Sequence, residues 1–376
     1  MLSYWEKSSF IHHDLIVVGG GIVGLSTALH FQLAHPKKKV AIIERGLFPS
    51  GASTKNAGFV CFGSISELAE NARTDSQNEL LSLVEKRYKG GLELRQLLGD
   101  PNIDYRPVGG YELDFQGDLH ERMYTFNDWL KPLFNNPVFS DARDKIPAFG
   151  FDQTKVKGLV KNQFEGSIDT GKMMEAFARK AREAGVQFYT QTEVLHYVEQ
   201  TNGVEVAVST TDGPLQLFTV QLALCTNAFT KTLLPDADLE PGRGMVVITK
   251  PLTWVPPQGT FHYHSGYNYF RNSGNRILLG GARHLDLKGE TTTKEGINSR
   301  LESQLKEDLK SFIAPERPLE IDYAWSGIMA FGEGKTPLLL HPSARVHAAV
   351  RLGGMGVALG TGLGKELAQQ LGATTS

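Results

Sequence analysis

The chain has 376 residues, of which 41% are apolar and 21% are charged, and these values are typical of a soluble globular protein with about two domains. Its 39 Lys and Arg against 41 Asp and Glu leave a net charge of -2, which argues against the broad basic surface of a nucleic-acid-binding protein. No run of about eighteen apolar residues is present, so we expect no transmembrane segment.

The two cysteines, Cys61 and Cys225, are far apart and lack metal-binding or redox spacing. We therefore expect a cytoplasmic protein without a metal site, and the sequence leaves peripheral membrane association open. Cys225 ends an apolar run and is expected in the core. Cys61 follows a glycine-rich segment, which leaves open whether it packs ordinarily or lies near a ligand.

Residues 14–24, DLIVVGGGIVG, predict a buried strand, a tight turn and the start of a helix. Gly19, Gly21 and Gly24 fit G-x-G-x-x-G, the pattern that brings a pyrophosphate to a helix N-terminus. A second strand follows and ends at Glu44, where a carboxylate can accept hydrogen bonds from ribose hydroxyls. This order of elements predicts a dinucleotide site.

The next loop, residues 45–64, contains small and polar residues that could contact the same ligand. Residues 67–98 then have helical periodicity, interrupted by Gly90-Gly91. A strand over 105–115 and a helix over 119–135 depart from the βαβ rhythm. These elements indicate a second domain.

Strands and helices alternate again, as in βαβ units, after a strand region at 156–168. A helix capped by Asp169 or Thr170 should end at Gly185. Thr226 and Asn227 lie at a strand-to-helix edge, where parallel sheets carry ligand-binding loops. The strands expected between these points are 186–190, 194–199, 203–210 and 216–224.

Residues 241–281 are rich in β-forming residues, and a helix is expected over 293–314. Tyr267, Tyr269 and Arg271 alternate along one strand and should share a face. That face could line a pocket for an amine or amino acid, or form a sheet surface or domain contact.

Near the end of the chain, Gly353, Gly354 and Gly356 follow a strand and open a helix. Too little chain follows for another βαβ unit, so this strand and helix should complete the sheet begun at Asp14. The helix N-terminus would then direct N–H groups at the same ligand. A reduced flavin, whose N1–C2=O edge becomes negative, needs such a second turn, whereas a nicotinamide does not.

The chain resembles the superfamily of FAD-dependent D-amino-acid oxidases and glycine oxidases, which includes sarcosine oxidases, γ-glutamylputrescine oxidase and D-amino-acid dehydrogenases. The similar stretches span nearly the whole chain in the same order. They are VVGGGIVG with Glu44, GASTKNAG, EGSIDT, LCTNAF, PGRGMVVIT, YFRNSGNRILLGG, WSGIMAF and LGGMGVALGTGLGKELA.

The resemblance implies an α/β fold: a discontinuous, Rossmann-like FAD-binding domain (1–80, 150–235 and 325–376) with an inserted α+β substrate domain (81–149 and 236–324) on a mostly antiparallel sheet. FAD should be non-covalent, because Lys55 and Asn56 stand where some relatives attach it through His, and no Cys follows Cys225. The residues expected to bind FAD are Gly19, Gly21, Ile22, Val23, Gly24, Glu44, Arg45, Ser53, Thr54, Asn56, Ala57, Gly58, Val194, Thr226, Asn227, Gly354, Met355, Gly356 and Val357.

The resemblance further implies oxidation of the C–N bond of a small amine or amino acid, with hydride transfer to flavin N5 and hydrolysis of the imine. Oxygen or a quinone would accept the electrons. Arg271 is the first candidate for a carboxylate anchor, Arg283 and Arg243 are alternatives, and Tyr267 and Tyr269 would line the pocket. No acid/base pair is evident, and a neutral amine needs none. The competing interpretations are an FAD-dependent 2-hydroxyacid dehydrogenase, a nicotinamide dehydrogenase and a non-catalytic flavin-binding module.

Overall fold

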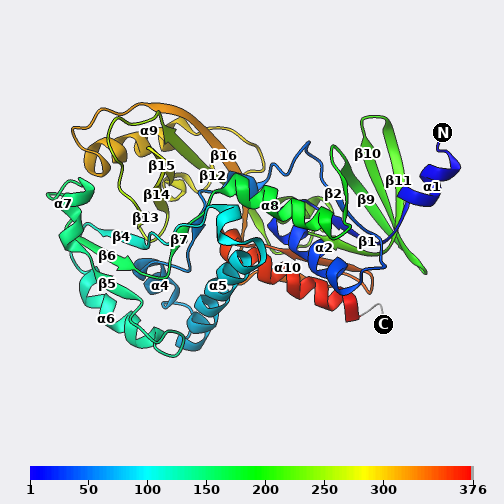
Figure 1. Cartoon of the computed structure of the whole chain (residues 1–376), viewed down its shortest axis with the longest axis horizontal. Coiled ribbons are helices and arrows are strands. Elements are labelled where there is room, and N and C mark those ends of the chain that lie inside the picture. The colour runs from blue at the N-terminus through cyan, green and yellow to red at the C-terminus, as the bar shows by residue number, and fades with distance from the viewer. Residues whose placement is uncertain (374–376) are drawn as a thin grey trace.

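The computed structural model describes residues 1–373 and contains two large β-sheets (Figure 1). In the first sheet, β1 pairs in parallel with β2 and β11, and β18 pairs in parallel with β11. The strand near the C-terminus thus joins the sheet that begins at β1, as predicted. The strands of this path are β1 (His12–Val18), β2 (Val40–Ile43), β8 (Gln187–Tyr189), β11 (Gly213–Leu224), β17 (Leu338–Leu340) and β18 (Val346–Val350).

Two further strands, β9 (Glu193–Gln200) and β10 (Gly203–Thr210), extend the first sheet as an antiparallel ribbon through the N-terminal half of β11. Figure 1 shows this ribbon beside the N-terminal helix α1 (Tyr4–Phe10). The strands predicted between 186 and 224 are therefore confirmed.

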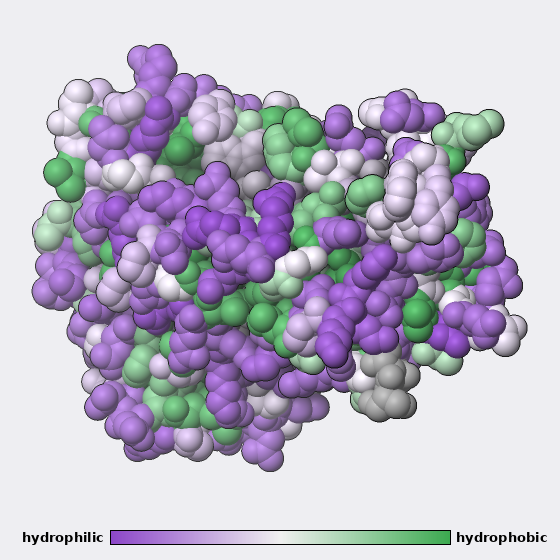
Figure 2. Space-filling model, turned by 45° about the vertical axis from the view of Figure 1, so that its right-hand side comes forward, coloured by the Kyte–Doolittle hydropathy of each residue, from purple (hydrophilic) through white to green (hydrophobic). Residues whose placement is uncertain are grey.

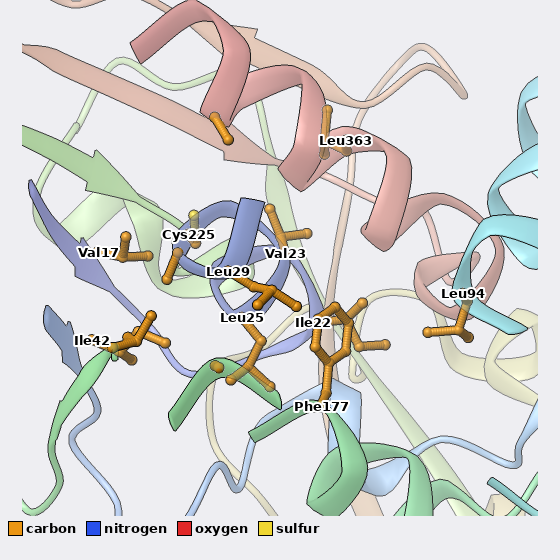
Figure 3. Packing of buried hydrophobic residues seen from close by; sticks show 14 of the residues in the cluster. Val17, Ile22, Val23, Leu25, Leu29, Ile42, Leu94, Phe177, Cys225 and Leu363 are labelled. Atoms are coloured by element: carbon orange, nitrogen blue, oxygen red, sulfur yellow. The ribbon is translucent and has the colours of Figure 1, made fainter. Parts of the chain in front are cut away.

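Four helices enclose the main core of the first sheet: α2 (Ile22–Ala34), α5 (Gln77–Leu98), α8 (Thr170–Glu183) and α10 (Gly356–Ala373). Figure 3 shows Leu25 of α2, Leu94 of α5, Phe177 of α8 and Leu363 of α10 in this core. Cys225 is buried among them, as expected from its apolar run.

The second sheet has the strand order β16-β12-β15-β14-β13-β4-β6-β5. All pairs are antiparallel except β13 with β4, which confirms the mostly antiparallel sheet. Its strands are β4 (Gly110–Asp114), β5 (Phe139–Asp141), β6 (Gly158–Asn162), β12 (Glu240–Thr249), β13 (Thr260–Tyr263), β14 (Asn268–Ser273), β15 (Arg276–Gly281) and β16 (Ile321–Phe331).

Two strands that overlap the expected FAD-binding segments pair in the second sheet. Strand β6 and the end of β16 belong to the second sheet, although residues 150–235 and 325–376 were expected in the FAD-binding domain. A small antiparallel pair, β3 (Phe59–Val60) with β7 (Gly166–Ser167), lies outside both large sheets.

Side chains along the strands of the second sheet point alternately to its two faces. One face packs in a hydrophobic core, and the other face lines the site. Phe261, Tyr263 and Phe270 are buried in a core with Phe312, which follows α9 (Ser299–Asp308) in a π-helical turn (Leu309–Ile313). The helix expected over 293–314 therefore begins six residues later, at Ser299. The side chains between these aromatic residues point to the other face.

The helix expected over 67–98 is two helices, α4 (Ile65–Asn71) and α5, because Ser76 caps the start of α5. Gly90-Gly91 do not interrupt α5. The helix over 119–135 ends earlier, as α6 (Leu119–Leu130). Two short helices complete the fold, α3 (Ala52–Lys55) and α7 (Ile146–Phe149).

Hydrophilic side chains predominate on the face in Figure 2, with apolar side chains in smaller groups between them. Among the helices of residues 1–373, none combines the length and the apolar character needed to cross a membrane.

Candidate active site

The first glycine turn joins β1 to α2 in a way that only glycines permit. Gly19 has φ +103°, and a Cβ at this position would lie 2.7 Å from the carbonyl oxygen of Cys225. A Cβ at Gly24 would lie 1.9 Å from the carbonyl oxygen of Gly19. Gly24 thus lets α2 pack against the turn, as predicted. Its own backbone is not part of the cavity wall.

Two polar side chains hold the first turn in place. Ser53 Oγ accepts a hydrogen bond from the Ile22 N–H at 3.0 Å. Glu44 accepts hydrogen bonds from the N–H groups of Gly20 at 3.0 Å and Gly46 at 2.9 Å, one on each carboxylate oxygen. Both side chains also line the cavity beside the turn. Ser53 and Glu44 therefore position the backbone that faces a ligand.

The second glycine turn lies between β18 and α10, as predicted. Gly353 and Gly354 have φ values of +56° and +85°. A Cβ at Gly353 would meet no protein atom within 4 Å, so this turn faces open space. The N-termini of α2 and α10 both line one cavity, and each presents the free N–H groups and positive dipole end that bind anions.

This cavity has a volume of about 420 Å³. Of the residues expected to bind the cofactor, all but Gly24 and Thr54 line it; the Thr54 hydroxyl instead donates to the carbonyl of Pro49. The residues that line it are Gly19, Gly21, Ile22, Val23, Glu44, Arg45, Ser53, Asn56, Ala57, Gly58, Val194, Thr226, Asn227, Gly354, Met355, Gly356 and Val357.

The cavity fits a long, anionic dinucleotide such as FAD on two observations. Its walls include two helix N-termini, and the glycines of the second turn leave space that side chains would fill. Arg45, at the first-sheet side, has its guanidinium carbon 3.8 Å from the ring centroid of Phe229.

The second sheet supplies the opposite wall of the cavity. Tyr267 and Tyr269 of the β14 region both line it, as predicted. The ring of Tyr269 lies across Gly280, where an added Cβ would be 2.6 Å from a ring carbon. Burial raises the pKa of Tyr269 to about 12. Its phenol is therefore neutral at ordinary pH and can donate a hydrogen bond.

Arg271 does not occupy the position expected of a substrate anchor. It shares a sheet face with Tyr269 but is not part of the cavity wall. Its guanidinium donates hydrogen bonds to the carbonyls of Ala57, Ile168 at 2.9 Å and Asn272 at 3.2 Å. Burial lowers its pKa to about 10. Arg271 thus joins the second sheet to the segments that carry Ala57 and Ile168.

The two alternative arginines differ sharply. Arg243 forms a bidentate ion pair with Glu290, with both N–O distances at 2.8 Å. Arg283 lines the cavity, with its guanidinium carbon 4.0 Å from the ring centroid of Phe331. Within residues 1–373 its guanidinium makes no hydrogen bond and no ion pair. Arg45 also lines the cavity, beside the first glycine turn, whereas Arg283 is the unpaired arginine near the second sheet and Tyr267.

The backbone directs Arg283 into the cavity. Gly281 has φ +119° and Ala282 has φ +61°, so the chain turns sharply at the end of β15. A Cβ at Gly281 would lie 2.1 Å from the carbonyl oxygen of Tyr267. Beyond this bend the chain leaves the strand direction, and the guanidinium of Arg283 lies over the ring of Phe331 in the cavity wall.

No motif in the sequence indicates His262 or Glu165 as site residues, and the position of Cys61 is compatible with ordinary packing or with a place near a ligand. His262 and Cys61 line the cavity, and His262 Nε2 lies 3.7 Å from Glu165 Oε2. Burial raises the pKa of the Cys61 thiol well above its ordinary value. The signal for His262 was its place between Phe261 and Tyr263, because a strand directs alternate residues to opposite faces.

Comparison with known proteins places this geometry in a family. A family model described as FAD dependent oxidoreductase matches residues 14–370. Glycine oxidase from Geobacillus kaustophilus (strain HTA426) is 26% identical over 346 residues, which covers 89% of this chain and 85% of the relative.

Solved structures agree on the fold. The crystal structure of glycine oxidase from Geobacillus kaustophilus aligns with a TM-score of 0.76 at 22% identity, over 96% of this chain and 95% of that one. L-proline dehydrogenase from P. horikoshii aligns with a TM-score of 0.74 at 19% identity, over 96% of this chain and 93% of that one.

Proposed function

The chain belongs to the family of FAD-dependent oxidoreductases, and on that premise we propose that it oxidises the C–N bond of a small amino acid or a related amine that carries a carboxylate. FAD, when bound, accepts the hydride from the carbon next to nitrogen, and water hydrolyses the resulting imine. The names of the relatives, glycine oxidase among them, support this class of reaction. The electron acceptor that reoxidises FAD is proposed to be oxygen or a quinone.

The observation that carries the proposal is the unpaired guanidinium of Arg283 in the cavity wall. Burial lowers the pKa of Arg283, but an arginine side chain stays charged in proteins. A charged group without a partner is costly to desolvate, and a substrate carboxylate would remove that cost with two parallel hydrogen bonds. We therefore assign the anchor role to Arg283 in place of Arg271.

The remaining roles follow from the walls of the cavity. Tyr267 and Tyr269 would contact the substrate and donate hydrogen bonds to it, and the aromatic wall would exclude water. The two glycine turns would hold the pyrophosphate and the flavin edge, respectively. The chain's contribution is thus binding, orientation and electrostatics.

The test is anaerobic reduction of the bound flavin by a substrate panel. The purified protein should be yellow and release FAD on heating. We expect the flavin absorbance to bleach with at least one amino acid or carboxylated amine, with release of ammonia or a smaller amine on turnover. Bleaching only by 2-hydroxy acids would replace the proposal with a hydroxyacid dehydrogenase. Reoxidation of the reduced protein by air or by a soluble quinone then identifies the class of acceptor.

A further inference from the structure

A buried imidazole and carboxylate lie beside the tyrosines in the cavity wall. His262 of β13 is the register partner of Tyr269 on β14 and of Glu112 on β4. Its ring packs edge-to-face against Phe59, with centroids 5.1 Å apart, and Phe59 packs in the same way against Tyr269 at 5.5 Å. His262 is therefore in the same part of the cavity as the proposed substrate-binding phenol.

The two ring nitrogens of His262 have different surroundings. Nε2 is buried and lies 3.7 Å from Glu165 Oε2. Nδ1 has no hydrogen-bond partner within residues 1–373. Because the ring is part of the cavity wall, Nδ1 is the nitrogen available to a bound molecule.

Glu165 is placed to stabilise a charged imidazole. Its side chain is 2% exposed, and its Oε1 accepts a hydrogen bond from the Phe62 N–H at 3.1 Å. In the described part of the chain, His262 is the only side chain that forms an ion pair with Glu165. A buried carboxylate favours a proton on the neighbouring imidazole.

Other titratable groups lie near His262, but none of them is as well placed to accept a proton from a bound molecule. Burial raises the pKa of Glu112 to about 7, and its carboxyl accepts hydrogen bonds from the Ser66 N–H and hydroxyl, but Glu112 does not line the cavity. Glu67 lines it but pairs with Arg87 at 2.8 Å. The pKa values of Cys61 and Tyr269 are raised, which leaves both groups as weak acids at neutral pH.

An amino-acid substrate needs such a group. Its amino group is mostly protonated at neutral pH, because the ordinary pKa is about 8 or higher. An ammonium has no free electron pair to assist departure of hydride from the adjacent carbon. The proton must therefore leave the nitrogen first, and the acceptor must lie within reach of the substrate.

We propose that His262 accepts this proton at Nδ1 and that Glu165 positions and stabilises the resulting imidazolium. The ammonium N–H bond breaks, its electron pair stays on the substrate nitrogen, and a new N–H bond forms on the imidazole. The positive charge thus moves from the substrate to the His262–Glu165 pair. This role rests on the proposed function and adds a catalytic residue to it.

The direction of the pH dependence follows from the charges. Burial acts to lower the pKa of His262, but the negative charge of Glu165, 3.7 Å from Nε2, together with the charges of Glu67 and Glu112, raises this pKa above its ordinary value. Only the neutral imidazole accepts a proton. The apparent second-order rate of flavin reduction should therefore rise with pH to a plateau, with its midpoint at the pKa of His262 in the free enzyme.

The test measures anaerobic flavin reduction against pH for the holoenzyme and three variants. H262Q should lose the rising limb and react about 100-fold more slowly at the wild-type plateau. E165Q should move the midpoint to lower pH. E112Q is the matched control, because it removes the carboxyl of the register partner of His262 on β4. The Glu112 carboxyl has a pKa of about 7, so it is partly neutral near neutral pH and its removal should move the midpoint less. An unchanged limb in H262Q, or equal shifts in E165Q and E112Q, would overturn the proposal.

An NMR titration of the His262 ring in the wild-type and E165Q holoenzymes provides a readout without turnover and does not depend on H262Q. We expect a pKa above the ordinary value in the wild type and a lower one in E165Q; equal values would overturn the pairing even if H262Q fails to fold. If no amine reduces the wild-type flavin, the proposed function fails, whereas a reducible wild type with an unaltered H262Q profile refutes only the role of His262.

Discussion

The guanidinium of Arg283 lies over the ring of Phe331, with its central carbon 4.0 Å from the ring centroid. This stacking orients a cation in the cavity wall and leaves its N–H groups unpaired in the described part of the chain. A planar guanidinium held in this way can bind both oxygens of a carboxylate.

Replacing Arg283 by Met should therefore weaken substrate binding selectively. Loss of two charge-assisted hydrogen bonds costs about 2–4 kcal/mol, or about 30- to 1000-fold in kcat/KM. Steady-state kinetics with the best substrate of the panel would measure this, and flavin content and Tm should stay close to wild type. Arg179→Met, on the exposed face of α8, is the matched control. A wild-type KM in R283M would exclude the anchor role.

Arg271→Met should produce the opposite pattern. The substitution leaves the carbonyls of Ala57 and Ile168 without the donor that joins them to β14, which costs about 2–4 kcal/mol of stability. We expect a lower Tm and weaker retention of FAD, with the KM of the remaining loaded enzyme little changed. Thermal unfolding with and without added FAD measures both effects. A large rise in KM at full FAD occupancy would restore Arg271 as a substrate ligand.

Removal of Arg243 should affect stability alone. Its partner Glu290 has a side chain that is only 1% exposed, and breaking a buried ion pair leaves an uncompensated charge that costs about 3–5 kcal/mol. Arg243→Met should lower the free energy of unfolding by about this amount in chemical denaturation. The double variant Arg243→Met, Glu290→Leu should recover most of the loss, and failure to recover it would show that the pair is not the cause.

The parts of the site that could be predicted depend on local rules. The turns at Gly19–Gly24 and Gly353–Gly354 each combine a strand, at least one glycine with positive φ and a helix start, and the acidic residue Glu44 directly follows the second strand. Such order is visible in a sequence because each step limits the residue types that fit. The fold could be predicted from the same order of strands, glycine turns and helices.

The parts that could not be predicted depend on long-range geometry. Arg283 enters the cavity because Ala282, a residue with a Cβ, adopts φ +61°, and no local pattern indicates such a conformation. His262 meets Glu165 because β13 pairs in parallel with β4, and Gly110 of β4 packs against the side chain of Glu165. For Arg271, the sequence predicts the sheet face that carries the side chain. It does not predict the hydrogen-bond partners, which are carbonyls from distant segments of the chain.

Two glycines of the cavity should respond differently to substitution. A Cβ at Gly21 would lie 2.9 Å from Ser53 Oγ, the atom that accepts the Ile22 N–H. Gly21→Ala should therefore disturb the first turn and weaken FAD binding about tenfold or more. At Gly356, the nearest atom to an added Cβ is 3.6 Å away, so Gly356→Leu should retain FAD but alter its absorbance and slow its reduction. Identical behaviour of the two variants in flavin titration and anaerobic reduction would contradict this division between the turns.

Substitution of two helical glycines by alanine should distinguish the effect of helix packing from the effect of helix propensity. A Cβ at Gly90 of α5 would lie 2.0 Å from the carbonyl oxygen of Ala358 in the first turn of α10, whereas a Cβ at Gly362 would come no closer than 3.5 Å to Glu93. Gly90→Ala should thus force α5 away from the helix that carries the second glycine turn, at a cost of about 1–3 kcal/mol. Gly362→Ala should be neutral or stabilise by up to about 1 kcal/mol, because alanine favours helix. Chemical denaturation of both variants with FAD bound measures the difference, and stabilisation of G90A would mean that α5 and α10 are not held this close in the folded protein.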